Sequence, residues 1–539
     1  MRRPIALPLA LLLLAALPAL ARDAAPREIP LTPGAPPMGQ QPRLPRDPAL
    51  AARPAALTVL YTNDIHSRVD PFPGDFGNRR YAGKGGFARL ASAIAREKAQ
   101  DPATLAVDSG DYLQGTPYFN FYKGEAELKL MQAAGFDAIT IGNHEFDNGV
   151  AGLKRVLPFY KGSLVTTNLT LGAGVGQRYL VKRVGPVRVG VFALITEVNG
   201  LVAASAFQGA RYHDPIASAQ AAVAKLRDEA DVVVMLSHIG TRMDHGSGNA
   251  EAGAHDGGLV YDEDVAAAVP GIDVIISGHT HLQVDPLKVV GKTQIVSTGM
   301  GGAYLGKLRL ELAGGAVRSA RNTLIPMDAG VPPAAGVEAM IAPYRAPMVA
   351  TLNTVIGEAT GVFDKYRPDQ AECGVNNLVA DAMLAGARSV DPQVAFAIAS
   401  SGTPRAAINA GPITMEDVFY ALPFDNQIVV QAVSGAVALE MLTLQRRAND
   451  HVRHAVAGVT YTLTANAGPV TDVRVGGVPL DPAKTYKVAV NDYMSEGSSG
   501  FTMLSKLPKR ATGVLQRDAL VALIKARQRL GPELGRIKG

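Results

Sequence analysis

Five of the ten histidines in this 539-residue chain stand in short polar clusters that also contain Asp, Asn or Gly. The clusters are Asp64-Ile65-His66, Gly110-Asp111, Gly142-Asn143-His144-Glu145-Phe146-Asp147, the lone His238, and Gly278-His279-Thr280-His281. Imidazole, carboxylate and amide groups are ligands for divalent metals that prefer nitrogen and oxygen. A single histidine is more often an ordinary hydrogen-bonding residue, but five of ten in such clusters indicate a metal site.

The spacing within two clusters supports the same chemistry. Asp64 and His66 are two residues apart, so in an extended chain their side chains face the same way, and His279 and His281 repeat this arrangement. With Asp111, Asn143 and His238, the clusters supply enough ligands for two metal ions. The other histidines are expected to be ordinary surface residues: His213, His245, His255, His451 and His454.

Most clusters follow an apolar, β-branched run that is typical of a buried strand, and helix-like segments lie between the runs. The predicted strands are 57–62, 104–107, 138–141, 163–167, 187–194, 232–236 and 274–276, and the predicted helices include 86–98, 124–134 and 216–229. Alternating strands and helices indicate an α/β fold with sheets buried on both faces. Such sheets gather ligand-binding groups at the carboxyl ends of their strands. A further pair of strands, 294–297 and 305–312, is expected to be antiparallel and to close this unit.

A second α/β pattern begins after a Pro- and Ala-rich connector. We expect a linker over 327–353 with a helix from about Gly336, and a second unit over 354–539. Its predicted helices are 376–387, 415–421 and 435–447, and its predicted strands are 394–399, 458–463 and 486–490. Two domains are the default for a chain of this length, because a single core rarely grows past about 250–300 residues.

The order Asp-x-His, Gly-Asp, Gly-Asn-His-Glu, lone His and Gly-His-x-His resembles the calcineurin-like metallophosphoesterases. The fuller sequences at 62–66, 108–111 and 142–147 are similar to those of the 5′-nucleotidase family, and the resemblance extends from Leu57 to about Phe501. It implies an α/β fold with an N-terminal four-layer metallophosphoesterase β-sandwich flanked by helices, here 57–326. A smaller C-terminal α/β substrate-binding domain, here 354–539, would follow.

The resemblance also implies how the clusters share two divalent ions, zinc, manganese or similar. The first ion would be held by Asp64, His66 and His281, the second by Asn143, His238 and His279, and Asp111 would bridge them. Two ions about 3.5–4 Å apart can hold a bridging hydroxide and clamp the oxygens of the phosphoryl group that it attacks.

His144 is left free by this ligand assignment. In the resembling family its position and the acid three residues later form a catalytic pair, here His144 and Asp147. His144 would then stabilise charge on the phosphoryl group or the leaving oxygen. The alternative is that Asp147 only caps a helix that starts near Asn148.

The C-terminal domain of that family supplies the substrate pocket, in which two aromatic side chains sandwich a nucleobase. Phe424 and Tyr493 match these two positions, and the alternative is that both are core aromatics. The resemblance assigns further substrate contacts to Arg405, Asn426 and Ser499.

Three positions of this pocket depart from the family pattern. Ser400 stands where an Asn is expected, Ser499 where an acid would grip both ribose hydroxyls, and Ala371 where an arginine is expected. A serine hydroxyl cannot accept two hydrogen bonds from a diol as a carboxylate can. The chemistry is therefore better supported than the specificity for nucleotides.

The leading functional hypothesis is an exported dinuclear-metal phosphohydrolase that converts nucleoside 5′-monophosphates to nucleoside and phosphate. The alternatives within the enzymes are a hydrolase of UDP-sugars, of 2′,3′-cyclic nucleotides, of other phosphate esters or of a sulfur ester. The alternative outside the enzymes is a non-catalytic surface protein that binds a ligand on this scaffold. The complete ligand set argues against the last, because an idle site would tolerate loss of Asp111 or Asn143.

The N-terminus resembles a secretory signal peptide: Arg2 and Arg3, an apolar run, and an Ala-x-Ala ending at Ala21. We expect a signal peptide over 1–21, cleavage after Ala21, and a secreted, periplasmic protein without a stable membrane anchor. Residues 22–56 are rich in Pro and Ala and are expected to form a disordered, mobile leader. The single cysteine, Cys373, excludes an intramolecular disulfide. A formal charge of +5 without a basic block does not suggest a nucleic-acid partner.

Overall fold

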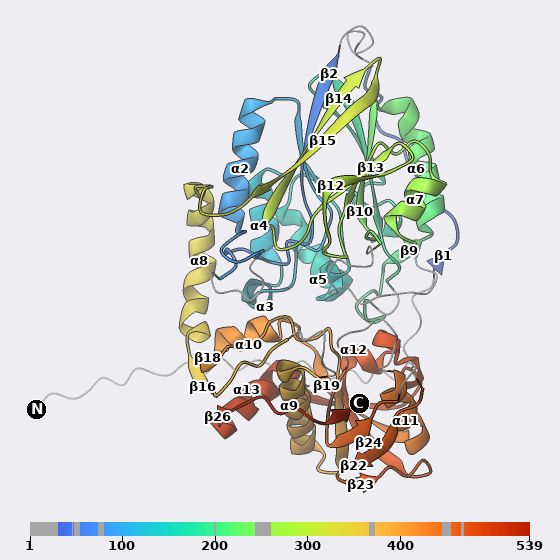
Figure 1. The fold of residues 1–539 in the computed structure, drawn as a ribbon. Coiled ribbons are helices and arrows are strands. Elements are labelled where there is room, and N and C mark those ends of the chain that lie inside the picture. Colours follow the sequence, from blue (N-terminus) through green and yellow to red (C-terminus); the bar gives the residue numbers. More distant parts are fainter. Residues whose placement is uncertain are drawn as a thin grey trace, which may run out of the picture.

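The computed structural model describes residues 31–45, 47, 54–73, 80–198, 201–242, 260–365, 372–444, 454–464 and 468–539. The N-terminal domain contains two six-stranded sheets (Figure 1). The first has the order β15-β14-β2-β3-β4-β5, with bounds Ala316–Pro326, Tyr304–Ala313, Ala55–Thr62, Thr104–Asp108, Ala138–Ile139 and Ser163–Leu164. The second has the order β12-β13-β11-β10-β8-β7, with bounds Gln283–Val290, Thr293–Thr298, Val274–Ser277, Val232–His238, Val187–Ile195 and Tyr179–Val184.

The two sheets pack face to face and each carries helices on its outer face. Valine, leucine and isoleucine side chains of β2, β3 and β14 meet those of β8, β10 and β11 in one buried cluster. The outer face of the first sheet is covered by α2 (Phe87–Gln100), α4 (Glu125–Ala134) and α8 (Ala335–Leu352). The outer face of the second is covered by α6 (Pro215–Glu229) and α7 (Asp262–Ala268). The expected four-layer α/β sandwich is confirmed.

Local sequence explains where these elements start. In α6, Pro215 occupies the first turn, and the Asp214 side chain accepts the backbone N–H of Ala217 at 2.7 Å. The strand β10 has the sequence VVVMLSH and is buried along its whole length, as a strand covered on both faces must be. Such strands place their polar last residues at the sheet edge.

The C-terminal domain is built around a five-stranded sheet with the order β20-β17-β24-β19-β25. Its strands are Ala455–Ala457, Val394–Ala399, Thr485–Asn491, Gln427–Ser434 and Lys509–Leu515. Helices α9 (Gly374–Val390) and α13 (Gln516–Arg527) pack on one face, with α10 (Met415–Ala421) nearby. The other face carries α11 (Gly435–Leu444), α12 (Asp492–Ser495) and the strands β21 (Val459–Thr462) and β22 (Thr471–Val475).

Short elements complete the fold. In the N-terminal domain these are α3 (Pro117–Tyr122), α5 (Gly149–Val156) and the strands β1 (Leu31–Thr32), β6 (Leu169–Thr170) and β9 (Arg211–His213), besides the 3-10 turns η1 (His144–Phe146) and η2 (Leu157–Phe159). In the C-terminal domain they are β16 (Val355–Ala359), β18 (Gly411–Thr414), β23 (Val478–Pro479), β26 (Arg529–Leu530), β27 (Ile537–Lys538) and the 3-10 turns η4 (Ser498–Gly500) and η5 (Thr502–Leu504).

The connector between the domains is the helix α8, which runs along one side of the molecule (Figure 1). Val337, Ile341 and Met348 of this helix are buried in the core of the N-terminal domain. Because β15 ends at Pro326 and β16 begins at Val355, we propose the domain limits 57–326 and 354–539 with α8 in the linker.

Two expectations about the fold are wrong. Residues 294–297 and 305–312 do not pair with each other, because β13 joins the second sheet beside β11 while β14 joins the first beside β2. Residues 31–45 are not a free leader. Instead β1 pairs with β9, and the Val181 N–H donates to Gln41 Oε1 at 3.2 Å. This segment thus covers the edge strand β7, which would otherwise expose unpaired backbone groups.

The whole proposed signal peptide, residues 1–21, and residues 22–30, 46 and 48–53 of the expected leader lie outside the described residues. Within the part that is described, no helix combines the length and apolar character that a membrane crossing requires.

Candidate active site

Four loops and the last residue of one strand bring the clustered residues to one edge of the paired sheets. Asp64 and His66 follow β2, Asp111 follows β3, and Asn143 and His144 follow β4 in the first sheet. In the second sheet His238 is the last residue of β10, and His279 and His281 follow β11. These strands are parallel, so their carboxyl ends share one edge. Two groups of possible ligands are close enough to hold a metal ion, because within each group the ligating atoms lie within 4.8 Å of one another. The groups are Asp64-His66-His281 and Asp64-Asp111-His238.

The first group is compact and buried. His281 Nε2 lies 3.4 Å from Asp64 Oδ1, and His66 Nε2 lies 2.9 Å from His281 Nε2. The His66 Nδ1 faces the Gln114 carbonyl at 3.1 Å, which directs Nε2 into the cluster. Nitrogen and oxygen lone pairs that converge in this way fit a divalent cation between them.

The second group shares Asp64 with the first, and its Asp111 also faces His66 of the first. Asp111 Oδ2 lies 3.1 Å from His238 Nε2 and 3.8 Å from His66 Nε2, so one oxygen faces both groups. His279 Nδ1 lies 3.0 Å from Asn143 Oδ1, and the rings of His238 and His279 are 5.2 Å apart. The His238 Nδ1 faces the Ser109 carbonyl at 2.8 Å, which directs its buried Nε2 toward Asp111.

Close carboxylate–imidazole pairs set the charges of the cluster. Burial disfavours ionised Asp111, but the imidazole of His238 and its neighbours hold the pKa of this carboxyl well below its usual range. Burial also disfavours charged His238, yet Asp111 raises its pKa to about 10. Burial and then the charge of His281 lower the pKa of His66 to about 3, and burial and then His238 lower that of His279 to about 3. His66 and His279, two of the proposed ligands, are thus neutral and keep a free lone pair beside an anion.

The backbone of the proposed ligand residues is strained. Asp64, His66, Asp111, His279 and His281 have φ values of 50°, 50°, 55°, 71° and 54°. Side-chain-bearing residues rarely adopt this left-handed region, and such conformations gather at functional sites. Asp64 and His66 are therefore not aligned by an extended strand, as their spacing predicts, but by a turn that still directs both inward.

Two residues that hold the ligand loops were not identified from the sequence. The buried carboxylate of Glu145 accepts the backbone N–H groups of Asp111 at 2.9 Å, Leu113 at 3.0 Å and Gly142 at 2.6 Å. Asn63 donates to Asp64 Oδ2 at 2.7 Å. Their positions inside the two motifs, next to proposed ligands, were the available signal.

His144 and Asp147 meet as a pair. His144 Nδ1 lies 3.0 Å from Asp147 Oδ2, and the backbone N–H of His144 donates to Asp111 Oδ1 at 2.9 Å. Burial disfavours the imidazolium, but Asp147 and then Asp111 raise the pKa of His144 above its ordinary value. Helix α5 has Asn148 as its N-cap, and no side chain caps it. The Asp147 carboxylate therefore contacts the His144 imidazole and does not cap the helix.

The C-terminal domain reaches this site through Phe424. Its ring stacks on that of His144 with centroids 5.6 Å apart and an interplanar angle of 24°. The Arg405 guanidinium lies 5.0 Å from the Phe424 centroid. The ring stacked on Phe424 is therefore that of His144, and both residues stand at the boundary between the domains.

Of the other residues assigned to the substrate pocket, Tyr493 lies on α12, Ser499 in the 3-10 turn η4, and Asn426 in the loop before β19. The hydroxyl of Tyr493 is hydrogen-bonded to Ser499 and Ser498, and Ser499 has a left-handed φ of 56°. The Asn426 carbonyl accepts the backbone N–H of Gln516 at 2.9 Å. Ser400 is buried, and Ala371 lies outside the described residues.

Two histidines are not the surface residues that were expected. His213 is buried and its Nε2 lies 3.0 Å from the Thr170 hydroxyl. His454 Nδ1 accepts the backbone N–H of Ser401 at 3.0 Å, and its ring lies 5.2 Å from that of Phe501. Burial lowers the pKa of His454 to about 4, so it is neutral at pH 7. His245, His255 and His451 fall outside the described residues.

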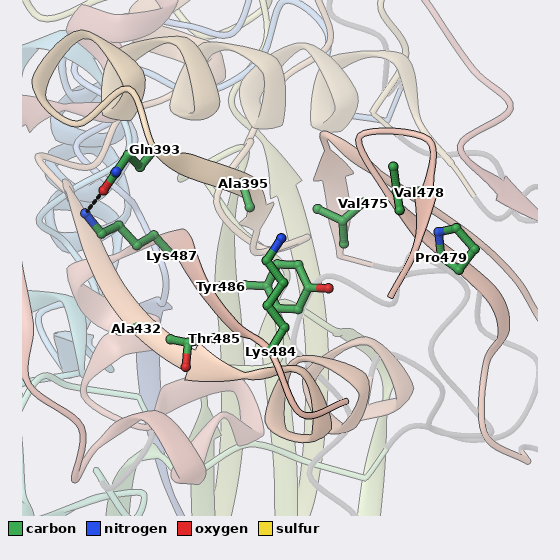
Figure 2. Close-up of a pocket in the computed structure, with 10 residues that line it drawn as sticks. All are labelled: Gln393, Ala395, Ala432, Val475, Val478, Pro479, Lys484, Thr485, Tyr486 and Lys487. Atoms are coloured by element: carbon green, nitrogen blue, oxygen red, sulfur yellow. Dashed lines mark hydrogen bonds between the residues drawn. The ribbon is translucent and has the colours of Figure 1, made fainter. Parts of the chain in front are cut away.

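A groove of about 560 Å³ elsewhere on the C-terminal domain contains none of these residues. Figure 2 shows its aliphatic side, Ala395, Val475 and Val478, with Lys484 beside Tyr486 and Lys487 bonded to Gln393. Lys487 also pairs with Asp391 at 2.8 Å. The residues that line the groove include no metal-ligating cluster, and we assign no chemistry to it.

Comparison with known proteins matches both halves of the chain. Residues 57–283 match the family model of the calcineurin-like phosphoesterases, and residues 355–506 match that of the 5′-nucleotidase C-terminal domain.

Relatives and solved structures agree with these matches. The 5′-nucleotidase of Bos taurus is 27% identical over 84% of this chain and 85% of its own length. The structure of a 5′-nucleotidase precursor from Thermus thermophilus is 27% identical, covers 90% of this chain and 99% of its own, and superposes with a TM-score of 0.76. The sulfate thiohydrolase SoxB from Thermus thermophilus, at 22% identity over 89% of this chain and 96% of its own, shares the fold with a TM-score of 0.70.

Proposed function

The chain belongs to the 5′-nucleotidase family of metal-dependent phosphoesterases, and from this premise we propose that it hydrolyses nucleoside 5′-monophosphates to nucleoside and phosphate. The observation that carries the proposal is the stacking of Phe424 on His144, centroids 5.6 Å apart. It brings an aromatic surface suited to a nucleobase directly beside the proposed catalytic pair and the ligand cluster.

The ligand residues fit two divalent ions, zinc, manganese or similar. We propose that Asp64, His66 and His281 would hold one, that Asn143, His238 and His279 would hold the other, and that Asp111 would contribute to both. When bound, two such ions supply Lewis acidity to the phosphoryl oxygens and lower the pKa of the attacking water.

The protein's own residues do the rest of the proposed reaction. His144, whose pKa is raised by Asp147, donates a hydrogen bond to the charge that develops on the phosphoryl group or on the ribose 5′-oxygen as its bond to phosphorus breaks. Arg405 offers donors to an anionic group, and Phe424 and Tyr493 hold the base. Glu145 keeps the Asp111 and Asn143 loops in register by binding backbone N–H groups of both.

Ser400 and Ser499 leave other nucleotide esters as the main alternative substrates. A pocket with a serine in place of a diol-gripping carboxylate discriminates less against UDP-sugars or 2′,3′-cyclic nucleotides. The sulfate thiohydrolase shares the fold, but no residue described above favours sulfur-ester chemistry in this chain.

Purified protein reconstituted with Mn²⁺ or Zn²⁺ tests the proposal. We expect phosphate release from AMP and UMP at rates above those from UDP-glucose, 2′,3′-cyclic AMP and β-glycerophosphate. The matched control is the Asp111→Ala protein, which should release none. Faster turnover of a substrate other than a nucleoside monophosphate would overturn the substrate assignment, and no turnover of any ester would favour a ligand-binding protein.

We further propose export, with residues 1–21 removed as a signal peptide and the mature protein in the periplasm. The basic start, apolar run and Ala19-Leu20-Ala21 support this proposal. N-terminal sequencing of protein recovered from a periplasmic extract should begin at Arg22.

A further inference from the structure

The loop that carries Phe424 is held from both domains. It joins α10 to β19 in the C-terminal domain, yet the Asn120 side chain of α3 donates to the Pro423 carbonyl at 2.6 Å. Lys123 Nζ, at the end of α3, lies 2.5 Å from Asp425 Oδ2. The N-terminal domain thus grips the residues immediately before and after Phe424.

The C-terminal domain grips the same loop from its other side. The buried guanidinium of Arg517, on α13, donates to the Leu422 carbonyl at 3.1 Å and to Asp425 Oδ1. It also lies 4.4 Å from the ring centroid of Phe419. Asp425 therefore pairs with one cation from each domain, through a different oxygen in each case.

Apolar packing supports the same junction. Phe419 of α10 is buried in the core cluster of the N-terminal domain, with its ring 5.7 Å from that of Phe121 on α3. Asn120, Phe121 and Lys123 are thus neighbouring contacts of one short helix with α10 and the loop after it. The placement of Phe424 depends on how this helix meets the C-terminal domain.

We propose that Asn120 and Lys123 form an interdomain latch with Pro423 and Asp425, and that this latch positions Phe424 over His144. The inference rests on the proposed function, which it deepens: the latch makes recognition of the base depend on contact between the domains. Asn120 and Lys123 are positioning residues, because they act on substrate only through Phe424.

The charges at the latch suit a contact that forms and opens. Burial disfavours ionised Asp425, but Arg517 and Lys123 lower the pKa of its carboxyl below the ordinary value. The side chains of Lys123 and Asp425 are 38% and 37% exposed, so salt screens their attraction. The latch therefore guides the loop without locking the domains together.

The test measures two substrates, AMP and β-glycerophosphate, in a double variant of the latch and in a control variant. In Asn120→Ala/Lys123→Met protein, KM for AMP should rise about tenfold, the scale of one exposed ion pair and one or two hydrogen bonds. Values for β-glycerophosphate, which has no base to stack, should stay within about twofold, since the latch acts through Phe424. The control is Lys129→Met, because Lys129 pairs with Glu125 on its own helix at 2.6 Å. Equal loss on both substrates, or no change on either, would overturn the latch.

A second measurement does not depend on nucleotide turnover. Lys123→Cys/Asp425→Cys protein should be bridged by a bifunctional thiol reagent matched to the length of a lysine–aspartate pair, detected as one added linker by mass spectrometry. Lys129→Cys/Asp425→Cys protein should not be bridged. The native Cys373 is buried and interferes with neither. If the unaltered enzyme hydrolyses β-glycerophosphate but no nucleotide, the proposed function is wrong. The latch is tested separately in that case, because absence of the bridge in Lys123→Cys/Asp425→Cys protein would refute it.

Discussion

Asp111 and His144 are joined by a hydrogen bond from the His144 backbone N–H to Asp111 Oδ1 at 2.9 Å. The other oxygen of the same carboxylate faces the imidazoles of His238 and His66 at 3.1 Å and 3.8 Å. One side chain therefore fixes the loop of the proposed catalytic histidine with one oxygen and faces the proposed metal ligands with the other. Substitutions can separate these two tasks.

We expect Asp111→Asn to abolish phosphohydrolysis while the protein stays folded. The amide oxygen can still accept the His144 N–H, but the amide group supplies no negative charge and no second acceptor between the two ligand groups. Metal analysis should show fewer than two ions per chain, and circular dichroism should match that of the unaltered protein. Retention of even about a tenth of the turnover with two ions bound would contradict a bridging role.

His144→Asn should lower turnover by roughly 10²–10⁴-fold, the usual scale for one charge-stabilising or proton-transferring group. Metal content should be nearly unchanged, because His144 pairs with Asp147 and its side chain belongs to neither ligand group. Loss of an ion in this variant would instead make His144 a ligand.

The pH profile tests the partner of His144. Burial disfavours its imidazolium, but Asp147 and Asp111 outweigh burial and raise its pKa. If turnover needs protonated His144, activity is kept below this pKa and falls as the pH rises through it. Asp147→Asn removes part of the attraction, so the alkaline limb of kcat should move to lower pH. A limb that stays in place would mean that another group titrates.

The sequence predicted that these residues would lie together, because each follows, or ends, a strand recognisable by its own apolar run, as His238 at the end of β10 shows. The carboxyl ends of neighbouring parallel strands must then meet, whatever the details of the loops. The backbone conformation of the site could not be predicted from the sequence. The left-handed φ values of Asp64 and His66 are set by the surrounding loops rather than by their own residue types.

Contacts between distant segments account for the remaining differences. β13 pairs with β11 and β14 pairs with β2, and the residues of β13 and β14 alone do not indicate which strand each will pair with. Gln41 binds the edge strand β7 through Val181, which lies 140 residues further along the chain. The stacking of Phe424 on His144 depends on how two separately predicted domains meet.

Glu145→Gln should weaken metal binding, although the two side chains have nearly the same size. The carboxylate accepts three backbone N–H groups, whereas the amide offers one oxygen and turns an NH₂ donor toward the others. A buried donor left without an acceptor costs about 1–3 kcal/mol. We expect a lower melting temperature and metal affinity reduced about 10–100-fold, as for other groups that orient ligands. Unchanged affinity in a metal titration would show that the loops hold their positions without Glu145.

Ser499 lies beside Tyr493 and stands where the family places a carboxylate, so the unaltered enzyme should distinguish poorly between AMP and 2′-deoxy-AMP. Ser499→Asp restores an acceptor for two hydroxyls, and Asp tolerates the left-handed φ of this position well. Because charge-assisted hydrogen bonds contribute about 1.5–3 kcal/mol, KM for AMP should fall roughly 10–100-fold and that for 2′-deoxy-AMP much less. The control is Ser389→Asp, which adds the same charge at an exposed position on α9. A strong preference of the unaltered enzyme for ribonucleotides, or equal KM values before and after Ser499→Asp, would place Ser499 outside the sugar pocket.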